Sequence, residues 1–155
     1  MVNADVLALE LGADAYLAMR MAGALRQQLL KQRESFVFET VFSDPVGEKV
    51  AFLHEATNSG YNVILCFIGI SGANISEERV AMRVSQGGHD VPPDKLTERF
   101  PRTIANLKAA VRVLPRIFIF DNENIARPYQ QVAVFERGKP VFLAEPLPAW
   151  LAGVL

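Results

Sequence analysis

The hydrophobic and polar positions of this chain fall into long mixed stretches and short, continuous apolar runs. The longest mixed stretch is rich in alanine, leucine, methionine, glutamine and arginine, which favour helix, and it contains no proline. We expect helices over about residues 7–33, 75–84 and 94–113. The first breaks near Gly12. A further helix starts at Asp44-Pro45, where proline is tolerated in the first turn, and ends before Ser59-Gly60.

The apolar runs predict strands. Aromatic and β-branched residues predict three of them, over residues 36–40, 62–68 and 116–120. Residues 132–135 and 141–143 flank Arg137-Gly138-Lys139 and predict a hairpin. Strands that alternate with helices indicate an α/β fold, a mostly parallel sheet with helices on both faces and a C-terminal β-hairpin. We expect one domain over residues 1–155.

The composition and net charge of the chain argue against several classes of protein. Hydrophobic residues make up 50% of the chain and charged residues 21%, so the chain has the material for a core. The net charge of −1 gives no overall field toward nucleic acid or an anionic membrane. No apolar stretch approaches the ~20 residues that span a bilayer, and early acidic residues argue against a secretion signal. We expect a cytoplasmic protein in which Cys66, inside an apolar run, is a small core residue.

Arginines cluster around a glycine-rich loop. Arg79 and Arg83 lie four apart before Gly87-Gly88, and Arg99 and Arg102 lie three apart after it, so each pair shares a helical face. Guanidinium groups match phosphate oxygens, which suits a mobile lid of a phosphotransferase. The alternative is a solvated basic face paired with neighbouring acidic residues. A nucleic-acid patch is a weaker interpretation, because aromatic residues are not interleaved with the arginines.

Polar residues also follow the predicted strands. Asp5, Glu39-Thr40 and Asp121-Asn122 lie where ligands bind in such sheets, beyond the carboxyl ends of the strands. Alternatively, Asp5 caps a helix, Glu39-Thr40 is a polar strand end and Asp121-Asn122 forms a turn. The chain has two histidines, His54 and His89, and no spacing typical of a metal site, so we expect none.

Several segments form a recognisable set: Val2-Asn3-Ala4-Asp5, Phe38-Glu39-Thr40, Arg79-Val80, Gly87-Gly88-His89-Asp90-Val91-Pro92, Arg99-Phe100-Pro101-Arg102, Asn106-Leu107 and Phe120-Asp121-Asn122. Together they resemble the zeta-toxin-like P-loop kinases, in the bacterial branch described as predicted ATPases or UDP-N-acetylglucosamine-kinase-like proteins. The resemblance implies an ATP- and Mg²⁺-dependent phosphotransferase. Its acceptor would be a small molecule with a hydroxyl group, such as a nucleotide sugar.

The resemblance also implies roles for individual residues. Asp5 would orient the acceptor hydroxyl as a base. The acceptor would be held by Glu39, Thr40 and Ser43. The catalytic lid cations would be Arg79, Arg83, Arg99 and Arg102. The nucleotide side would comprise His89, Asp121 and Asn122.

One family element is missing from this sequence. No G-x-x-x-x-G-K-[ST] motif occurs, and Gly138-Lys139 is followed by proline. By the resemblance, the first strand, the P-loop and the first helix are absent, so residues 36–40 and 62–68 would lack their shared neighbouring strand. We expect a truncated kinase with little ATP affinity. The alternatives are a second chain that supplies the strand, by self-association or as an antitoxin, and a catalytically dead remnant that serves as a binding module.

Overall fold

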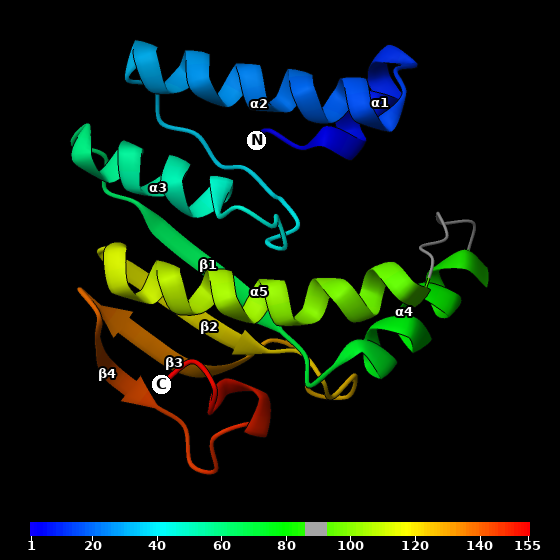
Figure 1. The fold of residues 1–155 in the computed structure, drawn as a ribbon, viewed down its shortest axis with the longest axis vertical. Coiled ribbons are helices and arrows are strands. Elements are labelled where there is room, and N and C mark those ends of the chain that lie inside the picture. The colour runs from blue at the N-terminus through cyan, green and yellow to red at the C-terminus, as the bar shows by residue number, and fades with distance from the viewer. Residues whose placement is uncertain (86–92) are drawn as a thin grey trace. The chain divides into compact units, whose positions relative to one another are not determined.

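The computed structural model describes residues 1–85 and 93–155, which form two compact units (Figure 1). The N-terminal unit is Met1–Val41, and the C-terminal unit is Phe42–Leu155. The predicted glycine-rich loop with His89 lies outside the described residues.

The N-terminal unit consists of two helices and an extended segment. Helix α1 covers Ala4–Leu11 and helix α2 covers Ala15–Gln32. The predicted break near Gly12 is confirmed, since Gly12 ends α1 with a φ of 60°. The proposal that Asp5 caps the helix is wrong. The Asn3 side chain accepts hydrogen bonds from the backbone N–H groups of Asp5 and Val6, and Asp5 lies in the first turn.

The predicted strand at residues 36–40 does not form. This segment makes one parallel bridge, between Val2 and Phe38, in which Val2 N donates to the Val37 carbonyl at 2.7 Å and Glu39 N donates to the Val2 carbonyl at 3.2 Å. The pairing goes no further because the chain turns into α1 directly after Val2, at its cap residue Asn3. The Arg26 guanidinium lies 5.0 Å from the centroid of the Phe38 ring and covers it.

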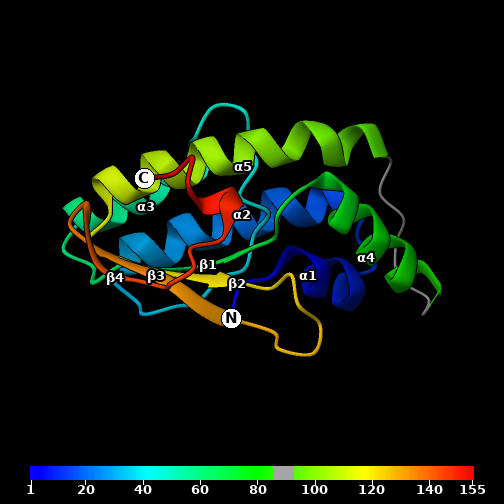
Figure 2. The same ribbon diagram turned by 90° about the horizontal axis from the view of Figure 1, so that it is seen from below.

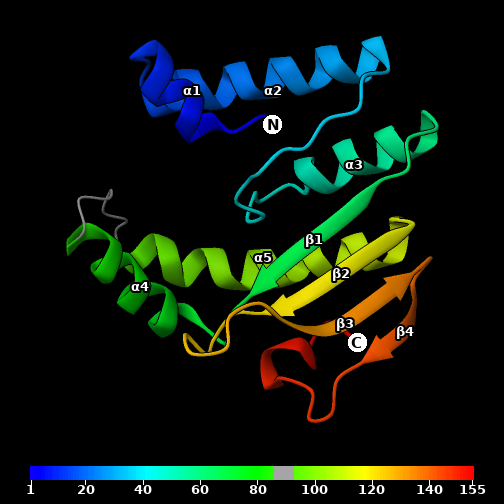
Figure 3. The same ribbon diagram turned by 180° about the vertical axis from the view of Figure 1, so that it is seen from behind.

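The C-terminal unit contains a four-stranded sheet. Its strands are β1 (Ile64–Gly69), β2 (Arg116–Asp121), β3 (Gln130–Glu136) and β4 (Lys139–Leu143). They lie in the order β1-β2-β3-β4 (Figure 3). The β1–β2 pair is parallel and the other two pairs are antiparallel, because helices provide the crossover from β1 to β2 while shorter connections join the rest. The α/β class and the terminal hairpin are confirmed, whereas the expected mostly parallel sheet is not found, because among the described strands only β1 and β2 pair in parallel.

The helices of this unit are close to those the sequence predicts. They are α3 (Glu48–Asn58), α4 (Ala73–Ser85), α5 (Pro93–Val113) and a short 3₁₀ helix, η1 (Ala149–Leu151). Figure 2 shows α5 along one face of the sheet. The fully buried side chains of Leu107 from α5, of Leu114 directly after that helix, and of Ile117 and Ile119 from β2 form the centre of its core. None of the helices in residues 1–85 and 93–155 has the length and apolarity to cross a membrane.

Strand β1 lies at the edge of this sheet. Phe67 is buried, whereas the alternate side chains of Ile64 and Ile68 are 49% and 54% exposed. Cys66 lies on the same side as these isoleucines and is exposed. The prediction that Cys66 is a core residue is therefore wrong, because successive side chains of a strand point to opposite faces and Phe67 takes the core position.

Candidate functional site

A polar cluster lies at the carboxyl ends of β1 and β2. The backbone N–H of Asn122 donates to the Gly69 carbonyl at 2.9 Å, and the Ser71 hydroxyl donates to Glu123 Oε1 at 2.9 Å. The Arg79 guanidinium donates to the Asn122 carbonyl and, at 3.4 Å, to the Glu123 carbonyl. Helix α4 is thus fastened to the loop after β2, and two predicted site positions, Arg79 and Asn122, come together.

The side chains of Asp121 and Asn122 have structural partners. Asp121 Oδ1 accepts a 2.8 Å hydrogen bond from Trp150 Nε1, and Asn122 Oδ1 accepts one of 3.3 Å from the Tyr129 N–H. These bonds fit the alternative interpretation of the sequence, in which Asp121-Asn122 forms a turn. The Asn122 side-chain NH₂ group donates no hydrogen bond to the described residues, so it is available to a ligand.

The predicted lid arginines differ in their surroundings. Arg102 Nη2 lies 2.8 Å from Glu98 Oε2 in an exposed ion pair, as the solvated-face alternative predicts. Arg99 is half-buried, and within the described part of the chain its guanidinium has no hydrogen bond or ion pair. Arg83 belongs to α4, but its side chain is outside the described part. Among these residues, Arg99 has the guanidinium most available to an anion.

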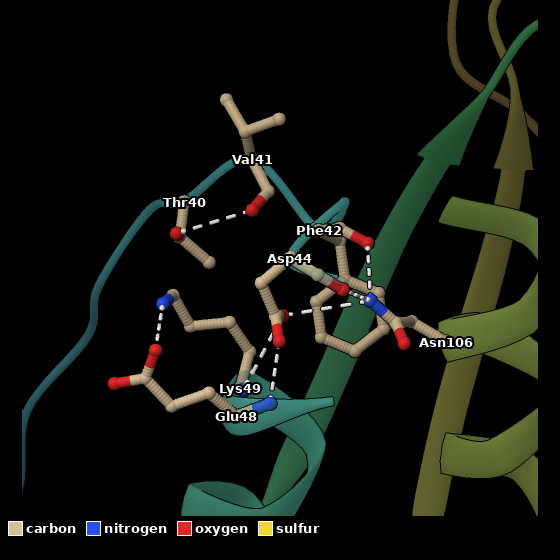
Figure 4. Close-up of polar contacts among 7 residues, drawn as sticks. All are labelled: Thr40, Val41, Phe42, Asp44, Glu48, Lys49 and Asn106. Carbon is tan, nitrogen blue, oxygen red and sulfur yellow. Dashed lines mark hydrogen bonds and ion pairs between the residues drawn. The ribbon is translucent and has the colours of Figure 1, made fainter. Parts of the chain in front are cut away.

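A buried amide organises the turn before α3 (Figure 4). Asn106, on α5, is 8% exposed. Its Nδ2 donates to the Phe42 carbonyl at 3.1 Å, the Asp44 carbonyl at 2.9 Å and, more weakly, Asp44 Oδ2 at 3.5 Å. The Asp44 carboxylate also accepts from the backbone N–H groups of Glu48 and Lys49. Helix α3 starts at Glu48, three residues after Pro45, where the sequence signal placed its start. The Asp44 carboxylate accepts hydrogen bonds from the first N–H groups of this helix, which have no partner within the helix.

Ser43 lies between the two carbonyls that Asn106 holds. The residue is 8% exposed, and its hydroxyl makes no hydrogen bond to the residues described. Phe42 anchors the turn from the other side, with its ring edge-on to that of Phe67 at 6.4 Å between centroids. Sequence reasoning assigned no role to Asn106, although an amide in the apolar middle of a helix was a usable signal.

The remaining predicted residues belong to the N-terminal unit. Asp5, Glu39 and Thr40 are exposed. Glu39 Oε2 accepts a 3.0 Å hydrogen bond from Asn3 Nδ2, so Asn3 both caps α1 and holds Glu39 beside the first turn that contains Asp5. Thr40 Oγ1 donates to the Val41 carbonyl at 3.4 Å. Within this unit, the two carboxylates are thus brought to the start of one helix.

The sequence lacks the motif that cradles the phosphates of ATP in P-loop kinases. The sequence has no P-loop lysine in a glycine-rich loop before a helix. Within residues 1–85 and 93–155, no group of three or more histidine, cysteine, aspartate or glutamate side chains is placed to hold a metal ion.

The parallel β1–β2 pair with its helical crossover and the arginine-bearing helices α4 and α5 are typical of α/β kinase-like proteins. A family model described as "Zeta toxin" matches residues 16–133, which is more than half of the chain, and the chain belongs to this family. Searches of curated proteins and of solved structures each found no match.

Family membership implies a kinase-like, ATP-dependent phosphotransferase with a small-molecule substrate, and the family's kinases generally use ATP and Mg²⁺. The resemblance seen in the sequence is confirmed at this level. The matched residues include Glu39, Thr40 and Ser43 and all four lid arginines, whereas Asp5 lies before them.

Proposed function

We propose that this chain carries the acceptor-binding and lid side of a phosphotransferase that moves the terminal phosphoryl group of ATP to a hydroxyl group of a small molecule. The observation that carries the proposal is the family match, which spans the acceptor-side residues and the arginines together. The acceptor class we favour is a nucleotide sugar. Glu39 and Thr40 are exposed and offer a carboxylate and a hydroxyl to its polyol part. Ser43, in the C-terminal unit, is assigned to the acceptor by the sequence resemblance.

Asp5 orients the acceptor hydroxyl in this proposal. A carboxylate near a hydroxyl accepts its hydrogen bond and directs the oxygen lone pair toward the phosphorus atom. Support comes from Asn3, which holds Glu39 at the start of the helix whose first turn contains Asp5. An acceptor held by Glu39 would therefore lie near the Asp5 carboxylate.

Arg99 is the lid residue we assign to the transferred phosphoryl group. Its guanidinium makes no hydrogen bond or ion pair to the described residues, whereas Arg79 donates to two carbonyls. Arg102 would give up its ion pair with Glu98 and bind the phosphoryl group beside Arg99. The loss is small, because an exposed ion pair contributes only about 0–1 kcal/mol. Arg83 completes the set on α4, and His89, Asp121 and Asn122 remain assigned to the nucleotide side.

A second candidate is a binding module without catalysis, and the open edge of β1 favours it. This edge strand carries six residues without a charge or a proline, the features that normally discourage pairing with another strand. An antitoxin or a second copy of the chain could add a strand there. In both candidates, this chain alone binds ATP weakly, since it lacks the P-loop motif.

Calorimetric titration with UDP-N-acetylglucosamine tests the proposal. We expect saturable binding that weakens at least about tenfold in Glu39→Gln and in Arg99→Ala. Arg112→Ala is the matched control, because Arg112 lies on the same helix at an exposed position well away from the Arg99 face. Equal affinity of all three variants and the natural chain would remove these residues from the acceptor site.

A further inference from the structure

The Asn106 amide fixes the chain on both sides of Ser43. One NH₂ group donates to the carbonyl of the residue before Ser43, at 3.1 Å, and to the carbonyl of the residue after it, at 2.9 Å. Both peptide planes next to Ser43 are thereby tied to α5. With both neighbouring peptides held, the Cα–Cβ direction of Ser43 is fixed, so its hydroxyl can occupy only the few positions that χ1 rotamers allow.

Asn106 shares one face of α5 with two of the arginines. Arg99, Arg102 and Asn106 follow one another at spacings of three and four residues, which places them in one row along a helix. Helix α5 therefore holds the Ser43 turn on the same face that bears the arginines. This relation lies entirely within the C-terminal unit.

This environment requires a hydrogen-bond donor at position 106. The atoms facing Nδ2 are two carbonyl oxygens and a carboxylate oxygen, all acceptors, so the residue at position 106 must donate. A carboxylate of the same shape would repel all three, and an aliphatic side chain would leave the carbonyls without a partner. The Ser43 hydroxyl, in contrast, makes no hydrogen bond to the described residues, so its bonding capacity is unused by them.

We infer that Asn106 is a positioning residue, which holds the turn at residues 42–44 so that the Ser43 hydroxyl meets the acceptor along the arginine-bearing face of α5. The inference rests on the proposed function for the identity of the acceptor. The acceptor contact itself belongs to Ser43, and Asn106 acts through it. The proposed occupant of this position is a hydroxyl or phosphate oxygen of a nucleotide sugar.

Hydrogen exchange of the free protein tests the positioning step without any ligand. We expect the amides of residues 42–44 and 46–49, on either side of Pro45, to exchange at least about tenfold faster in Asn106→Leu and, at neutral pH, in Asn106→Asp, since tenfold corresponds to about 1.4 kcal/mol of lost bonding. Asn62→Asp is the control for the charge change, because Asn62 is exposed and lies in a loop. Unchanged exchange in both Asn106 variants would overturn the inference.

The Asn106→Asp variant adds a pH readout. Burial beside three oxygens raises the pKa of the introduced carboxyl above the ~3.9 usual for aspartate. Its neutral form donates a hydrogen bond, so protection is greatest below the unfolded pKa and is lost as pH rises through the higher folded pKa. The ratio of the exchange rate in Asn106→Asp to that in the natural chain at the same pH should therefore fall toward one in acid. A ratio that does not change with pH would contradict the inferred donor role.

A double-mutant cycle on binding of UDP-N-acetylglucosamine tests whether Asn106 acts through Ser43. If it does, Asn106→Asp combined with Ser43→Ala weakens binding no more than the stronger single variant, whereas independent roles give additive losses. Additive losses overturn the inference and leave the proposed function standing. If the natural chain does not bind this probe, the proposed acceptor class fails, and the exchange ratios still decide whether Asn106 holds the turn.

Discussion

Replacement of Gly69 by alanine should destabilise the C-terminal unit strongly. A Cβ atom at this position would lie 2.3, 2.6 and 2.8 Å from three carbons of the Trp150 ring, where ordinary contacts begin near 3.4 Å. The ring cannot move freely, because Trp150 Nε1 donates to Asp121 at 2.8 Å and the ring packs 6.1 Å from that of Phe67, measured between centroids. Either the ring or the end of β1 must shift.

The size of the effect follows from these contacts. Overpacking a core typically costs about 1–3 kcal/mol. Loss of the hydrogen bond from Trp150 to the Asp121 carboxylate adds about 1.5–3 kcal/mol, and the better strand preference of alanine returns a few tenths. We expect Gly69→Ala to lower the free energy of unfolding by about 2–5 kcal/mol.

Urea unfolding followed by tryptophan fluorescence measures this loss. Trp150 is the only tryptophan of the chain, so its signal reports on the C-terminal unit alone. Gly72→Ala is the matched control, because a Cβ at Gly72 has no neighbouring atom within 4 Å and Gly72 has no positive φ. If Gly69→Ala unfolds at the same urea concentration as Gly72→Ala, the packing of Trp150 on the end of β1 is refuted.

Three further predictions concern the arginines and the N-terminal cap. Arg99→Ala should weaken binding of a nucleotide sugar at least about tenfold in calorimetry while Arg112→Ala leaves it unchanged; the reverse order would contradict the role of Arg99. Glu98→Gln should change the free energy of unfolding by less than about 0.5 kcal/mol, since its pair with Arg102 is exposed, and a loss above 1 kcal/mol would show that the pair is structural. Asn3→Ala should cost α1 about 1 kcal/mol and accelerate amide exchange of Asp5 and Val6, whereas Asn74→Ala, at an exposed position, should leave both amides unchanged.

Local signals in the sequence predicted the helices well. Glycine at position 12 and the Ser59-Gly60 pair mark helix ends because their effect depends on the backbone next to them. The runs that form β1 and β2 were equally legible, because each is a short, nearly continuous apolar segment. These features required no knowledge of distant residues.

The predictions that failed depend on partners far along the chain. Residues 36–40 have the composition of a strand, but Val2 offers them a single bridge. Which face of β1 is buried depends on the segments that pack against the strand. In the structure Phe67 lies on the buried face and Cys66 on the exposed one. A continuous apolar run does not specify which face is buried, because both sets of alternate positions are hydrophobic.

In the candidate site, too, local features were predicted from the sequence and contacts between distant residues were not. The arginines were found from their spacing, but only the structure separates Arg79, bound to two carbonyls, from Arg99 with its open guanidinium. Asn106 was missed because its role depends on acceptors at Phe42 and Asp44, more than sixty positions earlier in the chain. Asp5 lies outside the residues that the family model matches, so its role as base rests on the resemblance of the sequence.

The central claim is that this chain holds the acceptor side of the family's site while lacking the nucleotide cradle. Calorimetric titration of one preparation, first with UDP-N-acetylglucosamine and then with Mg²⁺-ATP, tests it most directly. We predict saturable binding of the nucleotide sugar, weakened in Ser43→Ala and Arg99→Ala, and little binding of ATP. Tight, Mg²⁺-dependent binding of ATP together with no binding of the nucleotide sugar would contradict the account.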